Sequence, residues 1–164
     1  MTPPSVDLEL YRPNAGVVLF NTQGLCWLGR RKGAEPPWVW QWPQGGMDEG
    51  EDGETAALRE LYEETGIQPA QVELLGSTPD WLTYDFPPEV LARQKKNWAG
   101  QKQLWFGYRF LGTDADFDLT AVPPQEFDAF RWAGLDEAVD SVIPWKRGVY
   151  RAVAETFRAF EVPT

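Results

Sequence analysis

The chain alternates between short apolar runs and polar segments that contain glycine or proline. Residues 15–20 and 25–30 are rich in strand-forming side chains and flank a polar stretch at 21–24, which predicts a β-hairpin. The same kind of pattern predicts further strands in residues 38–43, 71–78, 103–112 and 126–134. The pair Gly45-Gly46 is typical of a turn.

A helical spacing of three and four residues replaces this pattern over residues 53–65. Asp52 is a suitable N-cap for this helix, and Gly66 is a suitable stop. The residues that share one side of the predicted helix, and so form its apolar stripe, are Leu58, Leu61, Tyr62 and Thr65.

The C-terminal part of the chain predicts a short helix near residues 135–139 and an amphipathic helix over residues 148–160. The apolar side of the second helix carries Val149, Val153, Phe157 and Phe160. Strands and helices in this order indicate an α/β protein in which helices pack on a mixed sheet.

The length of 164 residues and the 43% of hydrophobic residues suit one packed domain, expected to span residues 1–164. The chain has no apolar run long enough to span a membrane, and its N-terminus lacks the features of a secretory signal. We therefore expect a cytoplasmic protein that does not bind membranes.

The sequence contains no histidine and a single cysteine, Cys26, which lies in an apolar segment. This composition excludes Ser-His and Cys-His nucleophile systems and zinc sites built from histidine and cysteine. Cys26 is predicted to be a buried apolar side chain. Catalysis would have to use carboxylates, a hard metal ion, lysine or tyrosine.

The formal net charge of −10 argues against a polyanionic partner, but most of this charge is local. Residues 46–64 contain eight carboxylates and one arginine, so this segment carries −7 and the rest of the chain −3. Basic residues gather elsewhere, in residues 30–32, 95–102 and 146–151. This separation suits a site with a metal-binding pole and a phosphate-binding pole.

Three carboxylates on the predicted helix, Glu60, Glu63 and Glu64, stand at i, i+3 and i+4 and therefore project from one face. Like charges at this spacing repel unless a cation neutralises them, and oxygen ligands select hard ions such as Mg²⁺ or Mn²⁺. A solvated acidic helix face is the alternative. An EF-hand loop starting at Asp48 is excluded, because Gly50 and Arg59 occupy positions that need ligands.

A longer spacing extends this pattern: Gly45, five residues, Glu51, seven residues, and then the run Arg59-Glu60-Leu61-Tyr62-Glu63-Glu64-Thr65-Gly66-Ile67. Residues 45–67 thus resemble the Nudix box, G-x5-E-x7-R-E-U-x-E-E-x-G-U with U apolar, at every specified position. The resemblance implies the Nudix fold, an α/β/α sandwich around a mixed sheet.

Other segments are similar to the branch of the Nudix family that contains RNA pyrophosphohydrolases and diadenosine-polyphosphate hydrolases. They are "YRPNAGVVLFN", "WQWPQGG", "GQKQLWF", "EFDAFRW" and "WKRGVYRAV". The resemblance implies metal-dependent hydrolysis of phosphoanhydride bonds in a nucleotide polyphosphate or at an RNA 5′ end. A non-catalytic nucleotide-binding or RNA-end-binding module on the same fold is the alternative. The oligomeric state is left open.

By matching positions, the resemblance implies that Glu60, Glu63 and Glu64 hold Mg²⁺ or a substitute such as Mn²⁺, with the Gly45 carbonyl as a further ligand. Glu63 or Glu126 would position or deprotonate the attacking water, and Glu126 would reach the metal from the opposite side. Arg59 would support catalysis by orienting these carboxylates. Glu51 would pair with Arg59 and hold the loop on the helix.

The resemblance also implies substrate contacts. The basic residues that would face phosphates or the first nucleotides are Arg12, Arg31, Lys102 and Lys146, each of which could instead be a surface charge. Trp145 would stack on a base, unless it is an ordinary core or surface tryptophan, and Tyr84 would contact phosphates. Asp85 would disfavour an extended RNA backbone, whereas the lysines downstream favour it, so both substrate types stay open.

Overall fold

The computed structural model describes residues 7–164. The first residues of the expected domain, which belong to the N-terminal segment that lacks a secretory signal pattern, lie outside the described residues. The strands are β1 (Tyr11–Phe20), β2 (Cys26–Arg31), β3 (Trp40–Gln41), β4 (Gln44–Gly46), β5 (Val72–Ser77), β6 (Leu82–Asp85), β7 (Gly100–Phe110) and β8 (Phe127–Ala133). The α-helices are α1 (Gly53–Thr65), α2 (Pro88–Arg93), α3 (Leu135–Ser141) and α4 (Arg147–Phe157).

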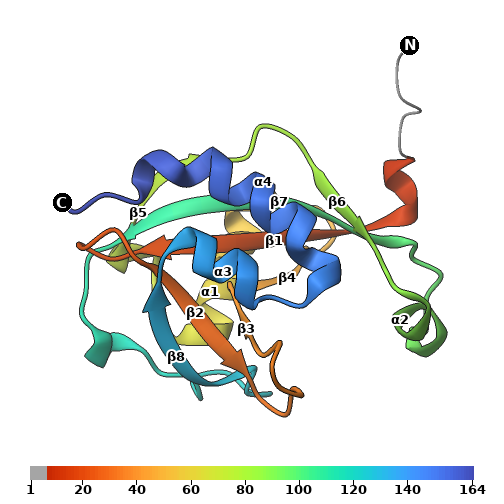
Figure 1. Cartoon of the computed structure of the whole chain (residues 1–164), viewed down its shortest axis with the longest axis horizontal. Helices are drawn as coiled ribbons and strands as arrows, with labels where there is room; N and C mark the ends of the chain where they lie inside the picture. Colours follow the sequence, from red (N-terminus) through yellow and green to blue (C-terminus); the bar gives the residue numbers. More distant parts are fainter. Residues whose placement is uncertain (1–6) are drawn as a thin grey trace.

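All eight strands belong to one mixed sheet with the central order β3-β2-β1-β7-β5 (Figure 1). Its centre is a long parallel pair, in which β1 lies beside β7 from Tyr11 opposite Gly100 to Phe20 opposite Arg109. The short strand β4 pairs antiparallel with β1, β6 pairs with β7, and β8 pairs with β2.

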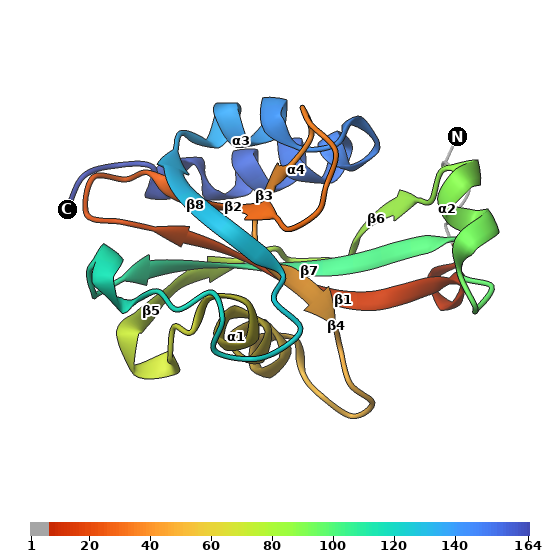
Figure 2. The same cartoon turned by 90° about the horizontal axis from the view of Figure 1, so that it is seen from below.

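Helices cover both sides of this sheet, with α1 on one face and α3 and α4 on the other (Figure 2). Each interface has its own buried cluster. Trp42, Trp105 and Tyr150 lie at the centre of the cluster under α3 and α4, and Trp27, Leu61 and Phe127 lie in the cluster beside α1. The predicted α/β/α sandwich is confirmed.

Helix α1 begins and ends at the predicted residues. The Asp52 carboxylate accepts a hydrogen bond of 2.7 Å from the Thr55 backbone N–H, and Gly66 has a φ of +77° that glycine adopts without strain. The predicted stripe is partly wrong, because Tyr62 is 40% exposed. Small side chains at Ala56 and Ala57 are buried instead and let the helix approach the sheet closely.

Three segments differ from the sequence-based expectations. Gly45 and Gly46 belong to strand β4 rather than a turn, because their backbone pairs with Ala15 and Asn14 of β1. The hairpin of β1 and β2 forms a single Cα pair, Phe20 with Cys26, before β2 diverges to join β3 and β8. The third segment, residues 82–93, contains strand β6 and helix α2, neither of which the sequence analysis predicted.

Within residues 7–164, no helix has both the length and the apolar character that crossing a bilayer requires.

Candidate active site

The carboxylates of the acidic motif line a cavity of about 270 Å³ between α1 and the segment that precedes β8. Glu60, Glu63 and Glu64 come from α1, and Glu126 stands immediately before β8 on the opposite wall. Residues 122–124 complete the lining. The fold therefore brings together four acidic side chains that the sequence places in two distant segments.

Glu64 is the most buried of these carboxylates, with only 7% of the residue exposed. One of its oxygens accepts a hydrogen bond of 3.2 Å from the backbone N–H of Gln44 in β4. Burial, together with the charges of Glu60 and Glu126, raises the pKa of Glu64 well above its usual value. The three glutamates thus do not form a solvated face opposite the apolar stripe, because β4 covers Glu64.

Close packing of β4 on α1 depends on Gly45. A Cβ atom at Gly45 would overlap the carboxyl group of Glu60, so only glycine lets the strand backbone lie against this side chain. Burial raises the pKa of Glu60 although Arg59 opposes the shift. The backbone of Gly45 and the Glu60 carboxylate therefore face the same small space.

Arg59 organises the acidic motif through its guanidinium group. It forms two hydrogen bonds of 2.8 Å with the two carboxylate oxygens of Glu51 and donates to the Gly46 carbonyl at 2.9 Å. It also contacts Glu60 at 2.9 Å and Glu63 at 3.2 Å. The bidentate pairing lowers the pKa of Glu51 to about 2 and ties the loop before α1 to the helix.

The donor set of the cavity fits a hard divalent cation. All four side chains offer carboxylate oxygens, and the uncompensated burial of Glu64 is the situation that a cation relieves. As they stand in residues 7–164, however, no three or more Asp, Glu or Cys side chains are grouped closely enough to hold a metal ion. Since Arg59 holds Glu60 and Glu63, these two carboxylates would have to share their oxygens with the cation or turn away from the arginine.

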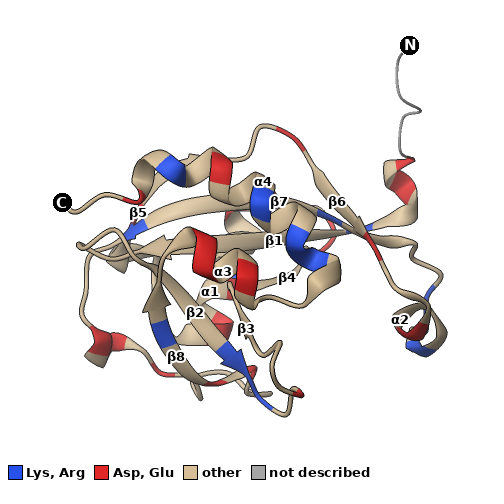
Figure 3. Ribbon diagram, viewed as in Figure 1, with Lys and Arg blue, Asp and Glu red and all other residues tan. Residues whose placement is uncertain are grey.

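A buried lysine, Lys146, lies near Glu64 and Glu126 of this acidic cavity. It is 7% exposed, and its ammonium nitrogen is 3.5 Å from the Gln41 side-chain oxygen. Burial, and then the nearby charge of Arg31, lowers the pKa of Lys146 to about 8, against the opposing influence of Glu126 and Glu64. Lys146 therefore lies near Arg31 and near the acidic residues Glu64 and Glu126. Figure 3 shows basic residues, in blue, at the end of β2 and on α4.

Two other predicted substrate contacts, Tyr84 and Trp145, belong to an aromatic cluster. Their rings lie edge to face with centroids 5.2 Å apart, and Phe86 contacts both. Tyr84 is 7% exposed, its hydroxyl donates to the Gln101 side chain, and burial raises its pKa. Tyr84 therefore reaches a phosphate only if this hydrogen bond breaks, whereas Trp145 is half-buried.

The remaining predicted contacts lie apart from Lys146. Lys102 sits over the Trp81 ring at 4.9 Å and lines a different pocket beside the acidic loop at 47–51. Arg12 lies against Gly46, since a Cβ there would come within 2.5 Å of its guanidinium nitrogen. Asp85 accepts a hydrogen bond from the Tyr11 hydroxyl.

Sequence reasoning missed a buried amide network beneath the cleft. The Gln103 side-chain nitrogen donates to Asn14 at 2.9 Å and to Gln44 at 3.2 Å, while the Gln103 oxygen accepts from the Trp105 indole at 3.1 Å. Asn14 and Gln103 are 1% and 2% exposed. Isolated amides inside otherwise apolar strands are the signal that could have revealed this support for β4.

Solved structures with a similar arrangement of strands and helices show which fold this chain has. The Ap4A hydrolase of C. elegans, in a binary complex, superimposes with a TM-score of 0.61 at 20% identity, covering 89% of this chain and 98% of that one. The dihydroneopterin triphosphate pyrophosphohydrolase of E. coli gives a TM-score of 0.68 at 20% identity, covering 87% and 95%. At this identity the likeness establishes the fold, which is that of Nudix hydrolases.

Sequence comparison then establishes the family. The NUDIX domain model matches residues 10–153. The RNA pyrophosphohydrolase of Caulobacter vibrioides (strain NA1000 / CB15N) is 56% identical over 157 residues, covering 94% of this chain and 90% of the relative. That of Rhodospirillum rubrum is 46% identical over 154 residues, covering 93% and 90%. The chain belongs to the Nudix family, whose hydrolases generally need a divalent metal ion.

Proposed function

We propose that this protein removes pyrophosphate from the 5′-triphosphate end of RNA and also cleaves diadenosine polyphosphates, both in the cytoplasm and as a single Nudix domain. The observation that carries the proposal is the cavity in which Glu60, Glu63, Glu64 and Glu126 converge, with Lys146 near two of these carboxylates. Relatives at up to 56% identity named RNA pyrophosphohydrolases support the RNA substrate. No observation in the described residues favours a non-catalytic module.

In the proposed reaction, the acidic residues of the cavity bind the cation and the nearby basic residues bind the phosphates. Glu60, Glu63, Glu64 and the Gly45 carbonyl would hold Mg²⁺, for which Mn²⁺ could substitute. When bound, this cation would neutralise charge on the nonbridging and leaving oxygens and acidify bound water. Arg31 and Lys146 would hold phosphate oxygens, and Arg59 would keep Glu60 and Glu63 oriented.

The water oxygen forms a bond to phosphorus while the bond from that phosphorus to the bridging oxygen breaks. The bridging oxygen leaves with the electron pair, as part of pyrophosphate from triphosphorylated RNA or of a nucleotide from a diadenosine polyphosphate. Glu63 or Glu126 accepts the proton of the attacking water, so no covalent bond between protein and substrate is needed. Trp145 would stack on a base of the substrate, with Tyr84 behind it in the aromatic cluster.

The test compares wild-type protein with Glu64→Gln and the control Glu49→Gln, which changes an exposed carboxylate outside the cavity. With Mg²⁺, the wild type and the control should release pyrophosphate from triphosphorylated RNA and should hydrolyse diadenosine tetraphosphate. Glu64→Gln should stay folded by circular dichroism and lose at least about 100-fold in rate, the order that loss of a metal-site ligand or its support causes. Inactivity of the wild type on both substrates would refute the proposal.

A further inference from the structure

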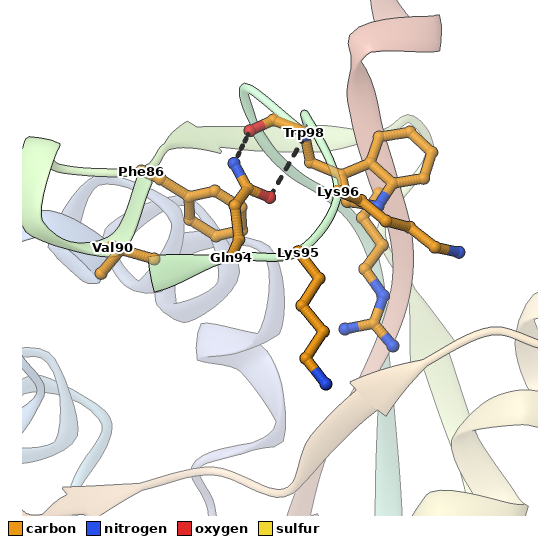
Figure 4. A pocket seen from close by; sticks show the side chains of 7 residues that line it. Phe86, Val90, Gln94, Lys95, Lys96 and Trp98 are labelled. Carbon is orange, nitrogen blue, oxygen red and sulfur yellow. Dashed lines mark hydrogen bonds between the residues drawn. The ribbon is translucent and has the colours of Figure 1, made fainter. Parts of the chain in front are cut away.

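A second pocket, of about 300 Å³, opens beside the start of β1 and combines positive charge with aromatic walls (Figure 4). It lies between helix α2, the loop that leads to β7, and the first residues of β1. The side chains used below are Arg12, Phe86, Gln94, Lys95, Lys96 and Trp98. We call this the basic pocket.

The loop that carries the two lysines is braced from within. The Gln94 side-chain nitrogen donates to the Trp98 carbonyl at 2.6 Å, and the Gln94 oxygen accepts from the Trp98 backbone N–H at 3.2 Å (Figure 4). This clamp closes the turn between the two residues, so Lys95 and Lys96 sit at its tip. Their backbone is therefore positioned before any ligand arrives.

The positive charges of the basic pocket are not neutralised by the protein. Among the ion pairs within 4.0 Å found in residues 7–164, none involves Arg12, Lys95 or Lys96. The carboxylate of Asp85 is bound by the Tyr11 hydroxyl and lines a neighbouring pocket instead. Three cations on one rim favour an anionic ligand.

Two series of residue contacts connect the basic pocket with the candidate active site. Arg12 lies against Gly46, whose carbonyl accepts a hydrogen bond from Arg59 of the acidic motif. Phe86 lines the pocket and also contacts Trp145, with ring centroids 6.4 Å apart. A substrate whose end lies at the acidic cavity could therefore extend past Trp145 to Lys95 and Lys96.

We propose that the basic pocket binds the phosphates of the RNA strand that follow the 5′-terminal nucleotide, and so favours RNA over dinucleotide substrates. An RNA strand adds one negative charge with each nucleotide, whereas a diadenosine polyphosphate ends in an uncharged nucleoside. Successive lysines beyond Arg12 match the first of these charge patterns. The proposal rests on the proposed function and specifies the substrate that the same site prefers.

The test uses Lys95→Ala/Lys96→Ala, with Lys95→Arg/Lys96→Arg to restore the charges. The control Arg151→Ala removes an exposed positive charge from α4, outside the basic pocket. Binding of a 5′-hydroxyl RNA oligonucleotide, which carries no anhydride to cleave, is measured by anisotropy against salt concentration. Steady-state kinetics are measured with triphosphorylated RNA and with diadenosine tetraphosphate.

The alanine pair should raise KM severalfold for RNA, leave kinetics on diadenosine tetraphosphate unchanged, and reduce the slope of log affinity against log salt by about 1.4, or about 0.7 per lost contact. The arginine pair and the control should behave as wild type. An equal rise in KM for both substrates would indicate that the pocket binds the distal nucleoside. An unchanged KM and affinity for RNA would exclude binding of the strand. Either result overturns the inference. Wild-type inactivity on both substrates would instead refute the proposed function.

Discussion

Lys146 shows at the scale of one residue how burial changes the meaning of a charge. In the sequence, Lys146 is one of several basic residues near the C-terminal helix. In the structure it is withdrawn from solvent beside Arg31, Gln41 and the acidic cavity, and its pKa falls to about 8. Its charge is therefore sensitive to mildly alkaline pH, which an exposed lysine's is not.

This lowered pKa predicts how Lys146→Met behaves with pH. Between pH 8 and 10.5 the unfolded chain holds a proton at Lys146 more tightly than the folded protein does, so this residue makes wild-type stability rise with pH. The Lys146→Met variant lacks this contribution to the rise in stability with pH. In urea unfolding, the free energy of unfolding of Lys146→Met minus that of the wild type should therefore be greatest near pH 7 and smaller near pH 10.

The same substitution has a kinetic consequence. The wild-type KM for triphosphorylated RNA should increase above pH 8 as Lys146 loses its proton, while the KM of Lys146→Met should already be high and should not follow that titration. Lys32→Met, which changes an exposed lysine, serves as the control and should keep the wild-type pH profile. Parallel profiles for wild type and Lys146→Met would contradict this assignment.

Single residues also show where sequence reasoning stops. The spacing of Glu60, Glu63 and Glu64 indicates that they share a helix face, and the motif indicates that Glu51 and Arg59 belong together. Neither reveals that the backbone N–H of Gln44 donates a hydrogen bond to Glu64. That contact depends on strand β4, which lies outside the helix in the sequence.

At the scale of elements, the bounds of α1 could be predicted because their signals are local: a cap, a stop and a helical spacing. Strand β4 could not, because two glycines have low strand propensity and pairing with β1 overrides it. Helix α2 was missed for a related reason. Proline is tolerated in the first turn of a helix, so the prolines at 87–88 permit the helix that begins there.

The contact between β4 and α1 predicts opposite outcomes for two glycine-to-alanine changes. Gly45→Ala should displace the Glu60 carboxylate and reduce hydrolysis at least about tenfold, because small displacements of catalytic groups have large effects on rate. Gly148→Ala meets no atom within 4 Å on α4 and should keep full activity while gaining up to about 1 kcal/mol.

Rates with triphosphorylated RNA and urea unfolding test both variants. The interpretation of Gly45 fails if Gly45→Ala folds and retains the wild-type rate, since the strand would then not need to approach Glu60 so closely. Loss of activity in Gly148→Ala would contradict the expectation that an alanine without close neighbours on α4 leaves hydrolysis unchanged.

At the scale of the whole molecule, the net charge of −10 is misleading about ligands. The excess of carboxylates is concentrated in one segment, and part of this segment is buried in the structure, as Glu64 shows. Arg12, Lys95 and Lys96, in contrast, line the basic pocket. The packing of helices on both faces of the sheet could be predicted from the periodicity of hydrophobic residues and from the resemblance to the Nudix family. The distribution of the basic side chains into separate pockets required the structure.

A folded protein with a buried and poorly compensated carboxylate should be stabilised globally by the cation that it binds. Mg²⁺ at about ten times its dissociation constant should raise the Tm of the wild type by about 3–6 °C, and EDTA should reverse the shift. Glu64→Gln should show little of this shift, whereas the control Glu49→Gln should show all of it. Differential scanning calorimetry measures the change, and an equal shift in all three proteins would exclude Glu64 from the site.

The parallel pairing of β1 with β7 sets the order in which the protein can be completed during synthesis. Tyr11 must wait for Gly100 before the centre of the sheet can close, and the acidic cavity must wait longer, until Glu126 has left the ribosome. A nascent chain that ends after α1 carries the whole acidic motif, together with β2 and β4, but lacks β7, the parallel partner of β1. A chain cut short by premature termination before residue 126 should therefore lack the complete acidic cavity and should not hydrolyse nucleotides.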